Sequence, residues 1–256
     1  MKMVLICIVV LVSSMAALAD MFLKYKKTTS SYAVAGQTIP EKAVYASSWI
    51  GKNRAWYSDG ENGCFVIDCK ANKLFIINNE SKSYSVIPLD NVTSMMDKAV
   101  EENASDAEEA GKMKEMMKGI MGAMAAGMQM TVTPTSERKK IGSWDCLRYN
   151  VTMTGMGEST SEIWATNQIK VDPAIFNNIR NAMMATMPGF DKIIKESHKI
   201  KGVPVLTRSM AKVMNAEVRS EEQLIEHAEK ASPAGIFEIP KGYREMKGTQ
   251  HNTHEE

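Results

Sequence analysis

Methionine thioethers form the most distinctive chemical pattern in this sequence. Steps of three and four residues separate most members of one stripe, which consists of Met113, Met116, Met117, Met121, Met124 and Met128. That spacing places these side chains along one face of an α-helix. Such a face can pack on a protein core, close over an apolar ligand, or offer thioethers to a soft metal.

The three readings differ in what the thioethers contact. An apolar helical stripe usually forms the buried face of a helix that packs on the rest of the protein. Unbranched, polarisable methionine side chains also repack around ligands of different shapes. Thioether sulfur is a ligand for Cu(I) as well, but the stripe is long and continuous and has no neighbouring Cys or His. We therefore assign no metal-ligating residues and no cofactor.

A hydrophobic ligand would need an apolar face on strands as well as on the helix. Aromatic residues suit strands and dominate cores, and the runs around Phe65 and Tyr149 combine them with aliphatic residues. The ligand-binding face that we expect consists of Phe65, Ile67, Phe75, Ile77, Leu147 and Tyr149, together with Met113, Met116, Met117, Met121 and Met124.

Motifs for catalysis are missing from the sequence. The chain has no nucleophile elbow, no phosphate-binding glycine loop and no pair of histidines at metal-ligand spacing before its C-terminal tail. His198 and His227 are isolated and lie beside Lys or Glu, which is typical of solvated histidines. We therefore expect a protein without enzymatic activity.

Three cysteines follow the first nineteen residues. Cys64 and Cys69 flank a strand-like run, so at about 3.3 Å per residue their Cα atoms lie roughly 16 Å apart, beyond the reach of a disulfide. A disulfide, if one forms, therefore joins Cys146 to Cys64 or Cys69. The alternative is three unpaired cysteines that pack as small apolar residues.

Short strands separated by turns are predicted to carry the apolar face. Strand-like runs occupy residues 22–25, 43–50, 54–57, 64–69, 74–77 and 84–87, with turns rich in Gly, Asn and Asp between several of them. Their spacing indicates an antiparallel meander rather than parallel βαβ units. Strands are predicted to resume at residues 141–153, 162–165, 205–214 and 217–227.

The methionine stripe lies in a predicted helical insertion at about residues 92–130. Acidic residues come first in this insertion and lysines later, the order that complements a helix macrodipole. A second helix is predicted from Asp172 to about Met187, because a capping side chain there precedes a proline. A shorter one is predicted from Phe190 to Ser197.

The first nineteen residues are predicted to be a cleavable signal peptide, with a basic start at Lys2, an apolar run and small residues ending at Ala19. About ten apolar residues are too few to span a bilayer. Cys7 lacks the small residues that precede a lipid-attachment cysteine. The sequence therefore predicts cleavage between Ala19 and Asp20, and a periplasmic or secreted protein with no lipid anchor and no membrane span.

Several motifs, taken in order, resemble periplasmic lipoprotein-carrier-like (LolA/LolB-like) domains. In the first half these are Trp49 with Arg54, Phe65-Val66-Ile67-Asp68, Leu74-Phe75-Ile76-Ile77 and Lys82-Ser83-Tyr84. The second half is most similar to an uncharacterised bacterial family, a domain of unknown function, in Cys146-Leu147-Arg148-Tyr149, Glu162-Ile163-Trp164, Gly202-Val203-Pro204 and Ile239-Pro240-Lys241-Gly242-Tyr243. The resemblance covers about residues 21–243. It implies a strongly curved, unclosed antiparallel sheet whose concave apolar face is covered by helices and holds acyl chains.

The resemblance does not extend to the arginine that locks the lid of the carriers, since neither Arg54 nor Arg148 lies in a matching motif.

We expect an α+β protein in which residues 20–247 form one domain and residues 248–256 a disordered tail. Its expected role is to bind or carry a hydrophobic small molecule or lipid. The alternatives are an envelope protein-interaction module with a filled core, and Cu(I) binding through the Met-rich helix. A formal charge of +1 argues against nucleic-acid binding.

Overall fold

The computed structural model describes residues 20–34, 36–89, 106–155, 157–171, 191–213 and 216–246. Four predicted segments lie outside the described residues: the signal peptide, the first part of the helical insertion, the helix expected from Asp172 and the C-terminal tail. Within the described ranges, no helix has the length and apolarity needed to cross a membrane.

Strands dominate the described part of the chain. The first meander and its flanks contain β1 (Asp20–Thr29), β2 (Tyr32–Val34), β3 (Gln37–Ile39), β4 (Lys42–Ile50), β5 (Arg54–Ser58), β6 (Gly63–Asp68), β7 (Lys73–Asn78) and β8 (Ser83–Pro88). The remainder contains α2 (Ala107–Gly127), β9 (Gln129–Ile141), β10 (Trp144–Thr154), β11 (Glu158–Thr166), α4 (Asp191–Ser197), β12 (Val203–Val213), β13 (Ala216–Lys230) and β14 (Arg244–Glu245).

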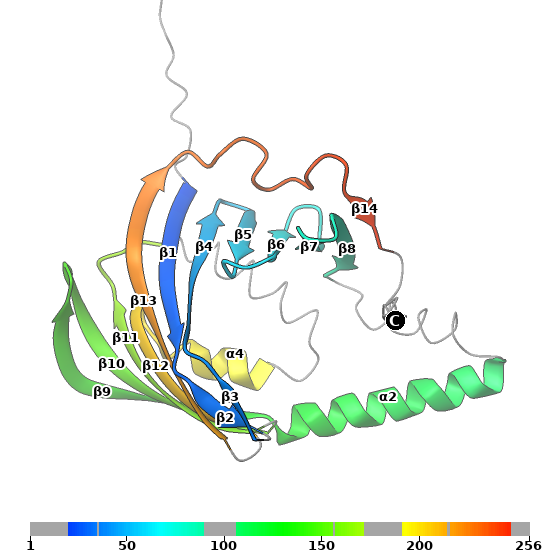
Figure 1. Ribbon diagram of the computed structural model, residues 1–256, viewed down its shortest axis with the longest axis horizontal. Coiled ribbons are helices and arrows are strands. Elements are labelled where there is room, and N and C mark those ends of the chain that lie inside the picture. The colour runs from blue at the N-terminus through cyan, green and yellow to red at the C-terminus, as the bar shows by residue number, and fades with distance from the viewer. Residues whose placement is uncertain are drawn as a thin grey trace, which may run out of the picture.

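One twelve-stranded sheet forms the framework of the described residues (Figure 1), in the order β14-β8-β7-β6-β5-β4-β1-β13-β12-β11-β10-β9. Near its middle, β1 pairs antiparallel with β4 on one side and with β13 on the other. Two antiparallel meanders, β4–β8 and β9–β13, extend from this centre, and only the short β14 pairs parallel to β8. The predicted antiparallel meander is confirmed.

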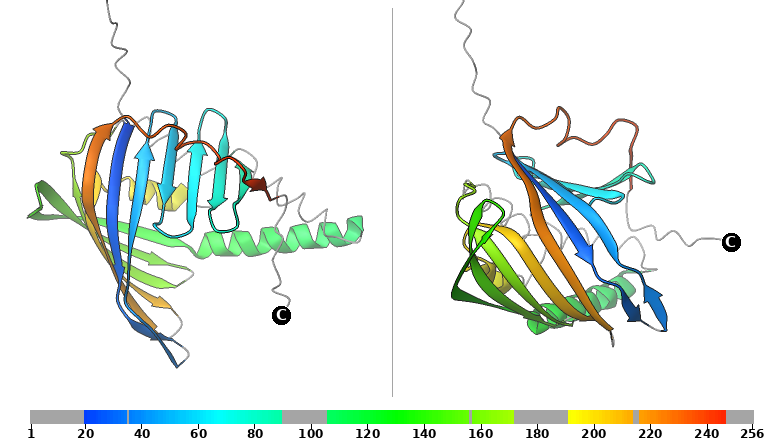
Figure 2. Two further views of the ribbon diagram at one scale, coloured as in Figure 1. Left: turned by 45° about the horizontal axis from the view of Figure 1, so that its top comes forward. Right: turned by 60° about the vertical axis from the view of Figure 1, so that its left-hand side comes forward.

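The sheet is curved and open, as expected. Register shifts occur at Lys24/Tyr25 where β1 meets β13, at Leu147/Tyr149 where β10 meets β9, and at Trp164/Ala165 where β11 meets β12. Each such bulge bends its strand and increases the local twist. The sheet therefore curls into a trough whose end strands, β14 and β9, remain apart (Figure 2).

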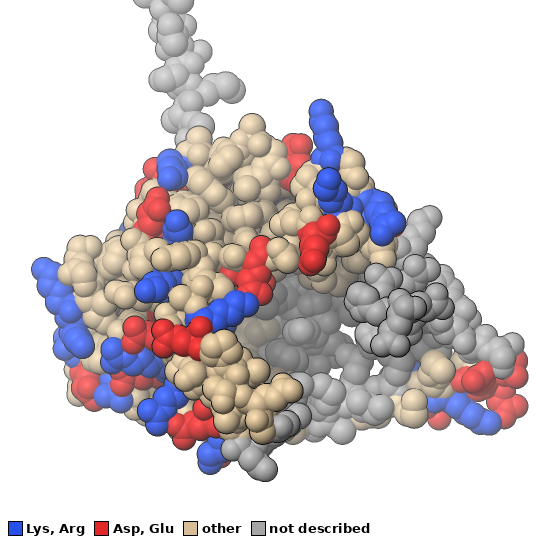
Figure 3. All heavy atoms as spheres, in the orientation of Figure 1, with Lys and Arg blue, Asp and Glu red and all other residues tan. Residues whose placement is uncertain are grey.

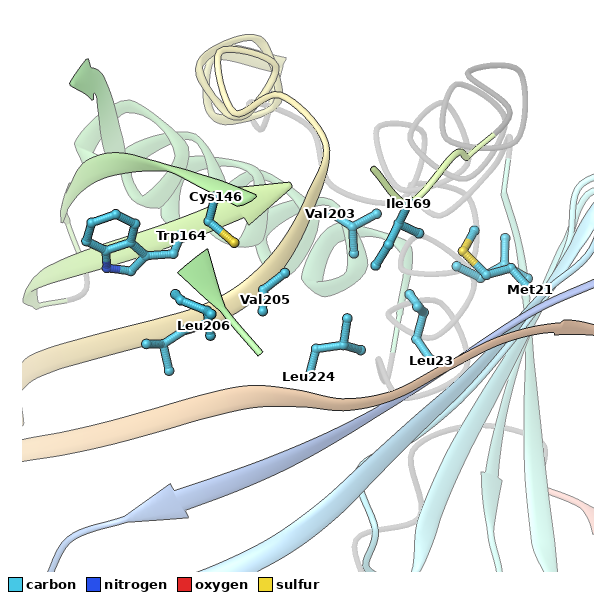
Figure 4. Close-up of a cluster of buried hydrophobic side chains, with 11 residues drawn as sticks. Met21, Leu23, Cys146, Trp164, Ile169, Val203, Val205, Leu206 and Leu224 are labelled. Carbon is cyan, nitrogen blue, oxygen red and sulfur yellow. The ribbon is translucent and has the colours of Figure 1, made fainter. Parts of the chain in front are cut away.

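Side chains alternate between the two faces of every strand, and the inner face of the trough carries the central core. Leu23 on β1 and Leu224 on β13 point toward Ile169 and Val203 (Figure 4). All four side chains are at most 5% exposed. This cluster fixes the floor of the trough, which we call the concave face.

The outer face of the first meander is covered by residues 231–246, which we call the C-terminal strap (Figures 1 and 2). The strap is fastened at both ends: the Arg54 guanidinium lies 4.9 Å from the centre of the Phe237 ring, and the Tyr243 hydroxyl donates a hydrogen bond to Asn79 Oδ1 at 3.0 Å. Met246 N–H donates to the Tyr84 carbonyl at 2.8 Å. The closing motif of the chain thus stabilises the outside of the sheet.

The Met-rich segment is a helix, as predicted, but its position as a lid is not confirmed. Helix α2 begins at Ala107 after Asp106, whose carboxylate accepts a hydrogen bond from Glu109 N–H at 2.8 Å as an N-cap. The helix projects away from β9 and does not lie against the strands of the concave face (Figures 1 and 2). Its last turn contains no basic residue, so the expected match of lysines to the helix dipole is incomplete.

The short helix expected at residues 190–197 is confirmed as α4, which lies inside the trough (Figure 1). Its Glu196 carboxylate accepts a hydrogen bond from Val132 N–H at 3.0 Å. That bond satisfies a backbone donor on β9, an edge strand whose unpaired amides would otherwise face solvent. Helix α4 therefore protects the sheet edge as well as covering part of the trough.

Candidate functional site

An apolar patch lines the concave face of the first meander. Phe65 on β6 lies opposite Ile76 on β7, and Ile67 lies opposite Leu74. Ile76 is 48% exposed, while Phe65 and Leu74 are half-buried. We call these four residues, with Ile87 on β8 opposite Leu74, the β6–β8 patch. It is an apolar wall of the trough that the described residues leave partly uncovered.

An aromatic pair extends the patch toward the centre of the sheet. Tyr57 on β5 lies directly opposite Phe65, and their rings stack with centroids 4.9 Å apart and an angle of 28° between planes. Such offset stacking adds to the free energy gained by burying the ring area. Tyr57 thereby connects the β6–β8 patch to strands β4 and β1.

The strand register separates the six strand residues expected to share one apolar face. Phe75 lies opposite Val66, and Ile77 lies opposite Cys64, so Phe75 and Ile77 belong to the outer face. Ile77 is 2% exposed, on the side covered by the C-terminal strap. Of the four expected residues on β6 and β7, only Phe65 and Ile67 lie in the trough.

The second meander contributes a more completely filled surface. Leu147, Tyr149 and Val151 share one face of β10, as predicted, and cluster with Val132, Ile163 and Ile200. Tyr149 is 1% exposed, and its hydroxyl accepts a hydrogen bond from Lys201 N–H at 3.1 Å. Leu147 is half-buried. Tyr149 is therefore a core residue of this wing rather than an open surface for a ligand.

The methionines of α2 are not brought onto the strand patch by the described contacts. Met113 is half-buried and Met116 is 59% exposed. The side chains of Met117, Met121 and Met124 lie outside the described part of the structure. Ligand contact by this stripe remains a prediction.

A polar row crosses the centre of the concave face. Lys27 on β1, Glu222 on β13 and Thr207 on β12 lie directly opposite one another. Burial raises the pKa of the Glu222 carboxyl, and the positive charge of Lys27 counteracts that rise. Nearby, the Tyr25 hydroxyl donates a hydrogen bond to the Pro204 carbonyl at 3.1 Å, and burial raises the pKa of this phenol.

Sequence reasoning missed this polar row. The only available signal was the alternation of Lys24, Tyr25, Lys26 and Lys27 in β1, which does not by itself show which lysine faces inward. The partner strand β13 is rich in glutamates, and only the register singles out Glu222 as the one facing Lys27. A sequence without strand pairing could not supply that information.

The outer face of the second meander carries a ladder of alternating charges (Figure 3). Arg148 on β10 contacts Glu137 on β9 at 2.9 Å and Glu162 on β11 at 3.0 Å. Arg208 on β12 lies 3.9 Å from Glu162 and 2.8 Å from Glu221 on β13. A groove of about 650 Å³ follows these residues, and Thr152 and Thr160 on the same face also line it. Because the charges are paired within the ladder, the groove has no strong net charge.

All three described cysteines are free thiols. Of the two alternatives that the sequence left open, the structure has the unpaired cysteines and no bridge from Cys146 to Cys64 or Cys69. Cys146 lies on β10, seven positions along the sheet from β6. At about 4.8 Å per strand that is roughly 30 Å along the sheet, far beyond disulfide geometry. Burial raises the pKa of each thiol.

Metal binding finds no geometric support in the described ranges, where His, Cys, Asp and Glu side chains nowhere gather in groups of three or more suited to an ion. His227 lies opposite Leu23 and its Nε2 is buried without a hydrogen bond. That imidazole lies at the apolar floor of the trough, and the described residues place no set of carboxylate or thiol ligands around it.

Comparisons with known proteins give distant likenesses only. No protein-family model and no curated protein matches the chain. The chain is similar to PNGF-II, with 12% sequence identity and a TM-score of 0.36 over 88% of this chain, and it spans 31% of that protein. It is also similar to a structure described as "putative outer membrane lipoprotein-sorting protein domain from Vibrio parahaemolyticus", with 8% identity and a TM-score of 0.28, covering 85% of this chain and 88% of that one. Likenesses this distant establish no family.

Proposed function

We propose that this protein binds or carries a hydrophobic small molecule or lipid in the trough of its curved sheet, without catalysing a reaction. The β6–β8 patch carries this proposal. Apolar side chains on a concave surface gain free energy by leaving water, at about 25 cal/mol per Å² of buried area. Ile76 on β7 is 48% exposed, so it is the residue of that patch with most to gain from a covering acyl chain.

Native purification followed by mass spectrometry of bound small molecules tests the proposal. Wild-type protein should retain acyl-chain compounds under mild extraction, and Ile76→Lys should lose most of them because a cation would then occupy the apolar wall. Tyr45→Lys is the matched control: Tyr45 is 51% exposed and lies opposite Lys26, on the outer face of β4. No bound compound in wild type, or equal loss in both variants, would contradict binding in the trough.

A second candidate is an envelope protein-interaction module. The outer groove along the charge ladder favours it, because three arginines line this groove and arginine is enriched at protein interfaces. Pull-down from envelope extracts with wild type and Arg219→Glu distinguishes it, since Arg219 lines the groove but lies outside the ladder contacts. A stoichiometric protein partner lost with this change, and no bound lipid, would favour the interaction module.

We also propose export with cleavage between Ala19 and Asp20, giving a periplasmic or secreted protein. Asp20 is the first residue of β1, so cleavage there would leave the central strand of the sheet whole. N-terminal sequencing of protein recovered from the periplasm or medium should begin at Asp20. A protein that keeps residues 1–19 would contradict this assignment.

A further inference from the structure

Glu222 is a half-buried carboxylate near the centre of the concave face. It lies opposite Lys27 and Thr207 on the two neighbouring strands. Among the described residues, no hydrogen bond or ion pair engages its oxygens, and the opposing Lys27 side chain is exposed. Lys27 acts on this carboxylate through its charge but makes no direct contact with it. A partly desolvated carboxylate without such a contact costs free energy, which a directly bound cation would recover.

The surroundings of Glu222 connect it to the apolar patch. Its charge raises the pKa of Tyr25 and of Tyr57, in each case after the larger effect of burial. The register places Tyr25 two residues from Lys27 on the concave face of β1, and Tyr57 on the same face of β5, two strands from β1. Tyr57 in turn stacks on Phe65, the first residue of the β6–β8 patch. The concave face therefore carries a carboxylate on β13, an aromatic ring on β5 and the apolar wall beyond it.

His227 Nε2, which lies at the floor of the trough, is also buried without a hydrogen bond, but other polar groups along the trough have partners. The Tyr25 hydroxyl donates to the Pro204 carbonyl. The hydroxyls of Ser161 and Ser209, one step farther along the trough, are hydrogen-bonded to each other at 2.8 Å. Glu222 is an acceptor with negative charge, so a ligand group complementary to it must donate hydrogen bonds and carry positive charge.

We propose that Glu222 anchors the polar end of the ligand, and that the ligand is an amphiphile with a primary ammonium group on an alkyl chain. This inference rests on the proposed function and narrows it. The ammonium group pairs with the Glu222 carboxylate, and the chain extends across Tyr57 onto the β6–β8 patch. An amphiphile ending in a carboxylate is repelled by Glu222 and binds more weakly.

Three ligands with the same twelve-carbon chain test the proposal: dodecylamine, dodecanol and dodecanoic acid. Each is titrated at pH 7.5 against wild-type protein that holds the neutral apolar fluorophore N-phenyl-1-naphthylamine. Glu222→Gln removes the charge with little change in shape. Glu226→Gln makes the same change on the outer face of the same strand, where Glu226 lies opposite Lys24.

Dodecylamine should displace the fluorophore from wild type at about tenfold lower concentration than dodecanoic acid, the effect expected of one charge-assisted contact. Glu222→Gln should weaken dodecylamine at least about fivefold and leave dodecanol within about twofold, and Glu226→Gln should change neither. An unchanged amine preference in Glu222→Gln, or equal weakening of all three ligands, would overturn the role of Glu222 while leaving apolar binding intact. Failure of the fluorophore to bind wild type at all would instead overturn the proposed function, and this inference with it.

Discussion

Ile76 and Ile77 are consecutive residues of β7 that lie on opposite faces of the sheet, the first 48% exposed in the trough and the second 2% exposed on the strap side. Ile77→Ala should lower the free energy of unfolding by about 2–4 kcal/mol, because it leaves a cavity in a packed region. Ile76→Ala should lower it by less than about 1 kcal/mol. Urea denaturation of both variants measures the difference. Similar losses in the two variants would show that the faces are assigned wrongly.

Gly202 has a backbone conformation that other residues rarely adopt, with φ of +87°. A Cβ added there would collide with the carbonyl of Thr166, a fully buried residue. Gly202→Ala should therefore cost at least about 2 kcal/mol of stability. Thermal unfolding followed by circular dichroism measures this loss.

Gly111 on α2 is the control for that substitution. No described atom lies within 4 Å of the position its Cβ would take. Gly111→Ala should leave stability unchanged or raise it by up to about 1 kcal/mol, since alanine is the better helix former. A stable Gly202→Ala variant would contradict the close approach of these two segments.

Glu162 is the central acceptor of the outer charge ladder. Arg148 contacts it at 3.0 Å and the Trp164 indole N–H donates to it at 2.7 Å, and its side chain is 27% exposed. Glu162→Ala should lower stability by about 1–3 kcal/mol, the range for hydrogen bonds to a charged group. The matched control is Glu158→Ala, which breaks an exposed pair with Lys212 of 3.3 Å and should cost at most about 1 kcal/mol. Denaturation midpoints of both variants at low and high salt measure these losses. Equal losses in the two variants would contradict a stabilising role of the ladder contacts of Glu162.

The raised pKa of Glu222 predicts how the stability of the protein depends on pH. Its pKa in the folded protein is raised, chiefly by burial, with Lys27 opposing the rise. The folded state therefore binds this proton more tightly than the unfolded state, and wild type loses stability as pH rises above about 4.3, the ordinary pKa of glutamate. Glu222→Gln should be more stable than wild type at pH 8, and this advantage should vanish at pH 4. Urea denaturation at both pH values measures it, and an advantage that grows toward acid pH would contradict the buried position of Glu222.

The sequence was sufficient for the elements with strong local signals. Turn residues between short apolar runs placed the strands of the first meander, and the Met-rich stretch is helical from residue 107 to 127. It did not reveal β9, because Pro134 and the charged run from Glu137 to Lys140 are unusual within a strand. Those features are tolerated because β9 is the edge strand of the sheet.

The candidate site depended on information that local patterns do not contain. Phe65 and Phe75 both lie on apolar strands, yet the pairing of β6 with β7 sends their side chains to opposite faces. Both faces of this meander are apolar, since one packs under the strap and the other lines the trough. Alternation could not therefore distinguish them, and Glu222 became visible only through its partners on β1 and β12.

Photo-cross-linking with a twelve-carbon alkylamine that bears a diazirine near the end of its chain tests the central claim most directly. Peptide mass spectrometry after irradiation should locate the label on concave-face residues of β6 and β7, foremost Phe65 and Ile76. An excess of dodecylamine should prevent the labelling. Label concentrated on outer-face residues such as Tyr45, or label that an excess of competitor does not reduce, would contradict the account that the trough is the binding site.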